Sequence, residues 1–110
     1  MKPLRFVGSA RETLSSFPDK LRTRAGYELF MVQVGREPND WKPMSSVGLG
    51  AAEIQLRDGA GAYRVIYVAR FDEAVYVLHA FQKKTQRTAQ KDLELAALRY
   101  RQVEALARKE

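Results

Sequence analysis

One stretch of the sequence limits the possible folds more than any other, because it predicts two paired strands by itself. Residues 51–58 (AAEIQLRD) alternate apolar and polar side chains, which is the pattern of a strand with one buried face. The turn sequence DGAG follows at 58–61 and favours a tight hairpin. Residues 62–71 are apolar on both sides except at Arg64 and Arg70, as expected for a central strand. The chain is therefore expected to build its core around an antiparallel hairpin.

The remaining segments add strands and helices to this hairpin. Residues 74–82 (AVYVLHAFQ) predict a third strand, which completes an antiparallel meander. Ser9 and Glu12 have the spacing of a capping box and predict the start of a helix. Thr88 is expected to cap a long amphipathic helix that runs towards the C-terminus. The other predicted elements are a strand at 3–8, a helix that starts at Pro18 and ends near Gly35, and a loop at 37–48.

These elements predict an α+β fold. Their order is β-α-α-β-β-β-α, with a small, antiparallel-rich sheet and the helices against one of its faces. The 110 residues suffice for one domain with one core, so we assign residues 1–110 to a single domain.

The charge of the chain favours an anionic partner. Lysine and arginine outnumber aspartate and glutamate by 19 to 13, which gives a net charge of +6 and a pI of about 9.8. Such an excess is typical of proteins that bind nucleic acid, the ribosome, an anionic membrane or an acidic protein. Without cysteine the chain has no disulfide or thiolate chemistry, and its single histidine argues against a zinc site. No apolar run approaches the roughly 20 residues of a membrane span, so we expect a cytoplasmic protein with no cofactor, metal or membrane partner.

Hairpin pairing predicts a polar patch on the sheet. If the loop spans 58–61, Gln55 faces Arg64 across the ladder, and residues directly opposite each other point to the same face. Glu53, Gln55, Arg57 and Arg64 then share one face, which the helices are expected to leave open. A charge in the middle of YRVIY either forms an ion pair, with Glu53 as the partner, or points to an anion such as phosphate.

A second basic cluster follows the third strand, in the sequence QKKTQRT. Lys83 and Lys84 lie at the end of that strand, and Gln86 and Arg87 follow them. Only one of two adjacent strand residues can face the same side as Arg64. The cluster is either a solvated strand end or one edge of an anion site, and its position beside Arg64 favours the anion site.

His79 is the residue whose ordinary pKa best suits general base catalysis near neutral pH. It lies within an apolar strand, however, and no serine, cysteine or aspartate is spaced around it as in a triad. A buried, hydrogen-bonded structural histidine is therefore favoured. Trp41, in the predicted loop, is expected to cover the core, and no Walker or dinucleotide-binding loop is present.

Three segments carry a resemblance to a known family. They are AAEIQLRDGAGAYRVIYV at 51–68, VYVLHAFQKKTQRT at 75–88, and the helix with LELAALRY that follows. Together they resemble the RelE/ParE superfamily of toxins, in its HigB-like, phage-related (Gp49-like) branch. The order of elements agrees over the whole chain, whereas the N-terminal 45 residues agree only as elements. The resemblance implies one toxin domain with the RelE-like microbial RNase fold.

The resemblance also implies an activity and a partner. Toxins of this kind pair with an antitoxin, commonly one with a helix-turn-helix domain, and HigB- and RelE-type members cleave mRNA in the ribosomal A site. The cleavage needs no metal, because the 2′-OH attacks the adjacent phosphate while basic side chains stabilise the developing charge. The catalytic residues implied here are Arg64, Lys83, Lys84 and Glu53. The implied RNA and phosphate contacts are Gln55, Arg57, Gln86 and Arg87.

Several alternatives stay open at this point. The general base is Glu53, Lys83, Lys84 or a tyrosine, although a long helix occupies the C-terminal end where some relatives carry a catalytic tyrosine. Two other functions share the fold. One is a ParE-like toxin that poisons DNA gyrase, and the other is an inactive phage-derived module that binds RNA or protein.

Overall fold

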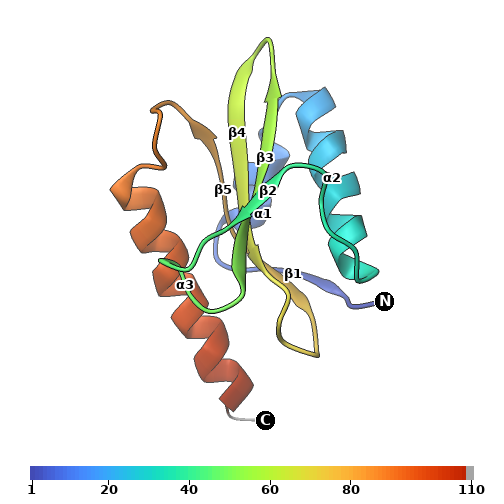
Figure 1. Cartoon of the computed structure of the whole chain (residues 1–110), viewed down its shortest axis with the longest axis vertical. Helices are drawn as coiled ribbons and strands as arrows, with labels where there is room; N and C mark the ends of the chain where they lie inside the picture. Colours follow the sequence, from blue (N-terminus) through green and yellow to red (C-terminus); the bar gives the residue numbers. More distant parts are fainter. Residues whose placement is uncertain (109–110) are drawn as a thin grey trace.

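Five strands form a single mixed sheet, and helices lie against both of its faces (Figure 1). The computed structural model describes residues 1–108. Its elements in chain order are β1 (Leu4–Phe6), α1 (Ala10–Ser15), α2 (Asp19–Gln33), β2 (Trp41–Pro43), β3 (Ala51–Asp58), β4 (Gly61–Val68), β5 (Val75–Lys83) and α3 (Gln90–Arg108). Across the sheet the strand order is β1-β5-β4-β3-β2, and only β1 and β5 pair in parallel. Among these helices none is long and apolar enough to cross a bilayer.

The predicted hairpin forms with the predicted register. Gln55 lies opposite Arg64, and Arg57 lies opposite Ala62. On the other side of β4, Lys83 of β5 also pairs with Ala62. Arg57, Ala62 and Lys83 therefore form one row across three strands, on the face that also carries Arg64.

The helices cover both faces of the sheet, so the prediction that they lie against one face is wrong. α1 and α2 enclose one core, which includes Leu14, Leu21, Leu29, Ile54 and Val65. α3 encloses a second core, which includes Ile66, Leu78, Ala96, Tyr100 and Val103. The reason is that β4 and β5 carry apolar side chains on both sides, and each side has to be removed from water. The α+β class itself is confirmed.

A short strand lies in the segment that was expected to be a loop. Trp41 of β2 pairs with Ile54, which gives the sheet one strand more than predicted. Trp41 is half-buried against the first core, as expected. The turn before β2 is fixed by Glu28 of α2, a buried carboxylate that accepts hydrogen bonds from the backbone and side-chain amides of Asn39, both at 2.7 Å.

The hydroxyl groups of both predicted helix caps have other partners. α1 starts after Ser9, but the Ser9 Oγ accepts a hydrogen bond from Arg99 Nη2 at 3.0 Å and makes no cap. α3 starts at Gln90, whereas the Thr88 hydroxyl donates to Glu53 Oε2 at 3.0 Å. In each case a buried charged group competes for the hydroxyl, and hydrogen bonds to charged groups are the stronger ones. The helix starts were thus nearly right, and the predicted capping bonds were wrong.

Candidate functional site

A buried ion pair lies at the centre of the predicted polar patch. Arg64 Nε is 3.3 Å from Glu53 Oε1, and these side chains are 4% and 0% exposed. Arg64 also donates from Nη1 to the carbonyl oxygen of Tyr63 at 3.0 Å. Of the two alternatives for Arg64, the structure contains the pair with Glu53. The patch is therefore less open than expected, because its two central residues are buried.

Two further groups surround the Glu53 carboxylate. Thr88 donates its hydroxyl to Oε2, and Lys42 Nζ of β2 lies 3.9 Å from Oε1. Glu53 thus links β2, β4 and the segment before α3 through one side chain. Its complete burial also separates the carboxylate from any substrate on the surface.

Three of the predicted site residues meet at a small pocket on this face. Gln55, Arg57 and Arg64 line a cavity of about 280 Å³, together with Asp40 and Leu56. The backbone N–H of Gln55 donates to the carbonyl oxygen of Asp40 at 2.8 Å, which holds the rim of the pocket in place. Two arginines therefore line one cavity, beside the acidic Asp40, and arginine is the residue type that suits an anion with several acceptor oxygens.

Lys83, rather than Lys84, lies on the face that carries this pocket. Lys83 is the last residue of β5 and belongs to the row of Arg57 and Ala62, whereas Lys84 follows the strand and is exposed. Partial burial lowers the pKa of Lys83, and the positive charge of Arg64 lowers it further. A lysine with a lowered pKa holds more of the neutral amine, the form that accepts a proton.

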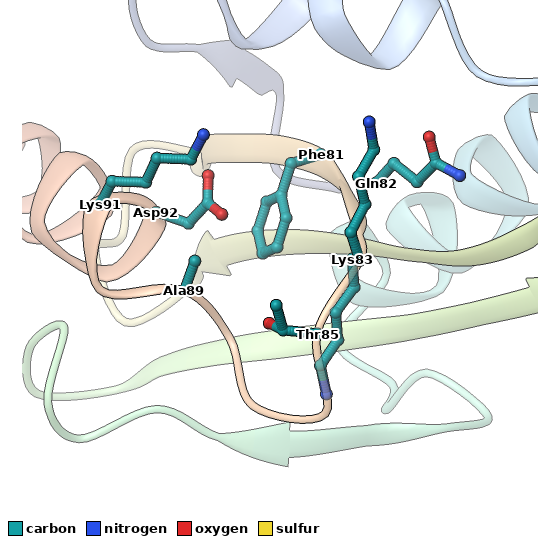
Figure 2. A pocket seen from close by; sticks show the side chains of 8 residues that line it. Phe81, Gln82, Lys83, Thr85, Ala89, Lys91 and Asp92 are labelled. Carbon is teal, nitrogen blue, oxygen red and sulfur yellow. The ribbon is translucent and has the colours of Figure 1, made fainter.

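A second pocket lies beside Lys83, between the end of β5 and the start of α3 (Figure 2). Its volume is about 420 Å³, and its lining includes Phe81, Lys83, Lys84, Thr85, Lys91 and Asp92. The predicted contacts Gln86 and Arg87 lie in the exposed segment between β5 and α3 and line neither of the two pockets. The structure therefore brings five of the eight predicted site residues to one sheet face and leaves Lys84, Gln86 and Arg87 on the adjoining loop.

His79 is buried against α3 and fits the structural role predicted for it. A shift in the β4–β5 register leaves Leu78 unpaired, so that Leu78 and His79 both face α3. His79 Nε2 lies 2.7 Å from Asp92 Oδ1, and the imidazole stacks on Phe81 with ring centroids 4.7 Å apart. Burial lowers the pKa of His79, although Asp92 acts in the opposite direction. The prediction of a buried, hydrogen-bonded histidine is confirmed.

Comparison with known proteins places the chain in a family. The family model of the phage-derived Gp49-like proteins (DUF891) matches residues 12–101. The chain belongs to the Gp49-like family. Its fold is similar to that of a mutant of the E. coli toxin RelE in the free state, with a TM-score of 0.60 and 18% sequence identity. The match covers 93% of this chain and 97% of that chain. No curated protein matches the sequence. The predicted membership of the Gp49-like branch and the predicted RelE-like fold are thus confirmed.

Several contributors to the site of this Gp49-like protein were not predicted from the sequence. Lys42 and Asp40 lie in the segment expected to be a loop, and nothing in the sequence signals that β2 brings them to Glu53 and the small pocket. Phe81 could have been found, because residues two apart on a strand share a face and Phe81 precedes Lys83 by two. Within residues 1–108, no three histidine or acidic side chains gather into a group that could hold a metal ion.

Proposed function

We propose that this Gp49-like protein is the toxin of a type II toxin–antitoxin pair and inhibits translation as a ribosome-dependent mRNA endoribonuclease. The family and the RelE-like fold support a toxin. The observation that carries the nuclease proposal is the position of Lys83 and Arg57 in one row beside the buried Arg64. Fixed positive groups of this kind suit a phosphodiester whose negative charge grows in the transition state.

The proposed reaction uses no metal. The 2′-OH of the substrate attacks the adjacent phosphorus, the bond to the 5′ oxygen of the next nucleotide breaks, and the products are a cyclic phosphate and a 5′-hydroxyl. One side chain has to take the 2′-OH proton, and positive groups have to stabilise the phosphorane. Lys83 fits the first role by its position, because it is partly exposed and lies in the same row as Arg57, and partial burial also lowers its pKa. Arg57, which is exposed in the same row, and Lys84 fit the second.

In this proposal Glu53 and Arg64 have supporting roles. Glu53 is fully buried, so it positions Arg64 instead of taking a proton from the substrate. Arg64 lines the small pocket beneath the bound phosphate, where its ion pair with Glu53 holds it in place. Gln55 lines the same pocket and donates to a phosphate oxygen. Gln86 and Arg87 contact neighbouring nucleotides from the exposed segment after β5.

The proposal includes the ribosome and an antitoxin as partners. The ribosome presents the mRNA, and the net charge of +6 favours association with such an anionic particle. A cognate antitoxin with a helix-turn-helix domain restrains the toxin in the cytoplasm until it is removed.

Expression of the chain without a partner tests the proposal. Translation should stop, and mRNA 5′ ends mapped after brief induction should show new cuts in phase with the ribosomal A site. Lys83→Met should lower cleavage by roughly 100-fold, in the range expected for loss of a general base. Lys84→Met should lower it less, and Lys20→Met, a change of an equally charged exposed residue on α2, should have no effect.

The possible outcomes separate the alternatives. Full activity of the double variant Arg64→Ala/Lys83→Ala would disprove the site assignment. DNA damage with intact mRNA would show a gyrase poison instead of a nuclease. Growth without arrest, at normal levels of folded protein, would show a binding module.

A further inference from the structure

The pocket between β5 and α3 has an aromatic wall that the proposed cleavage step does not use. Phe81 is half-buried and lines this pocket (Figure 2). The ring is stacked on His79, with an angle of 23° between the rings, and it also packs against the second core, while part of the residue lines the pocket. An aromatic ring supported from behind in this way is a platform for a second planar group.

Asp92 gives the same pocket an acceptor. Its carboxylate lines the cavity, and its Oδ1 is held by His79 Nε2 at 2.7 Å. The other ring nitrogen of His79, Nδ1, is buried without a hydrogen-bond partner. Nε2 therefore carries the proton and donates it to the carboxylate, because an ionised carboxylate only accepts. His79 thus fixes Asp92 at the pocket wall and supports Phe81 at the same time.

The proposed phosphate site adjoins this pocket. Phe81 and Lys83 are two residues apart on β5, which is roughly 7 Å along the strand. Both line the pocket, and Figure 2 shows the Phe81 ring between Asp92 and Lys83. At this spacing, Lys83 can contact the phosphate of a nucleotide while Phe81 stacks on its base. Asp92 can then accept hydrogen bonds from the donor edge of the same base.

We propose that this pocket binds one unstacked nucleobase of the RNA, with the base stacked on Phe81 and its donor edge on Asp92. Guanine fits best, because its N1–H and its amino group both donate towards a carboxylate, whereas the edge of uracil presents two acceptors beside its one donor. The inference rests on the proposed function and adds to it a base-recognition site next to the scissile phosphate.

Binding of single nucleotides to the full chain tests this site without the ribosome. Guanosine 5′-monophosphate, uridine 5′-monophosphate and inorganic phosphate are titrated while the backbone amide NMR signals of Phe81, Ala89 and Asp92 are followed. The guanosine nucleotide should shift these signals and bind at least about 5-fold more tightly than the uridine nucleotide. Phosphate alone should leave the signals of Ala89 and Asp92 in place.

Two conservative variants, each with a control, test the roles of the side chains. Phe81→Leu should weaken binding of the guanosine nucleotide roughly 10-fold, in the range measured for base–aromatic stacking. Asp92→Asn should bring the two nucleotides to similar affinity. The controls Phe30→Leu on α2 and Glu94→Gln on α3 change exposed residues outside the pocket and should alter neither value. Well-dispersed spectra establish that each variant is folded.

The outcomes distinguish this inference from the proposed function. Equal affinity for the two nucleotides, or no shift at Ala89 and Asp92, overturns the base site, and continued mRNA cleavage would then leave the nuclease proposal intact. Selective binding of the guanosine nucleotide that depends on Phe81 and Asp92 supports the base site. If a protein that binds in this way cut no mRNA, the nuclease proposal alone would fall.

Discussion

Replacement of Glu53 by glutamine should destabilise the protein strongly, although it changes only one oxygen to an amide nitrogen. Arg64 is 4% exposed and has Glu53 as its ion-pair partner at 3.3 Å. After the change, the arginine keeps its charge and its burial but loses the compensating carboxylate. Loss of one partner from a buried pair costs roughly 3–5 kcal/mol. We expect about 3 kcal/mol here, at the lower end, because glutamine can still accept one hydrogen bond.

The free energy of unfolding, measured by urea denaturation, gives the size of the effect. A loss of about 3 kcal/mol corresponds to a fall in Tm of roughly 12 °C or more in a domain of this size. Asp19→Asn is the matched control, because Asp19 also pairs with an arginine, Arg22, at 3.0 Å but is 92% exposed. An exposed pair contributes less than about 1 kcal/mol, so this control should change stability little.

A double variant separates buried charge from lost packing. Glu53→Gln combined with Arg64→Met removes the uncompensated charge while keeping most of the volume. It should recover about 2 kcal/mol relative to Glu53→Gln alone, since a buried pair can be replaced by apolar groups at little cost in stability. Equal stability of Glu53→Gln and Asp19→Asn, or no recovery in the double variant, would refute this reasoning.

Two further predictions concern the attachment of α3 to the sheet. Gly8→Ala should lower the free energy of unfolding by roughly 3 kcal/mol in urea denaturation, because Gly8 has φ +57° and an added Cβ would lie 2.8 Å from the buried Arg99 guanidinium. The control Gly26→Ala lies in open space on α2 and should stabilise the protein slightly. Equal effects at the two sites would contradict the steric reason. Burial lowers the pKa of His79 against the opposing effect of Asp92, and Arg99 lowers this pKa further. The unfolded chain therefore binds more protons than the folded chain, so the stability should fall as the pH drops below about 6.5. Unfolding free energies at pH 7.5 and 5.5 should show this loss in the wild type and a smaller loss in His79→Gln; identical losses would exclude His79 as the cause.

Local sequence patterns were sufficient to predict the sheet centre. Alternation and the DGAG turn fixed the β3–β4 register, because a shift by one residue would move every apolar side chain to the wrong face. That register by itself places Gln55, Arg57 and Arg64 on one face of the hairpin. The same two-residue period decides that Lys83, and not Lys84, shares their face.

The cover on the second face of the sheet was not predicted, although the sequence of β4 indicates it. β4 is apolar on both sides, which requires cover on both sides, and α3 supplies it on the face opposite α1 and α2. The pocket beside Lys83 exists because α3 starts close to the end of β5 (Figure 2). Asp92 reaches that pocket from a helix, so no strand periodicity could have placed it.

The sequence by itself determined which residues pair across the hairpin and which side chains share a face, because both depend on spacing along an extended chain. Only the tertiary structure decided the partners of the polar groups. Ser9 and Thr88 have the sequence of helix caps, yet their hydroxyls bind Arg99 and Glu53. The physical reason is burial: a charged group removed from water gains more from a hydroxyl than a helix end does, and burial depends on contacts between segments far apart in the chain.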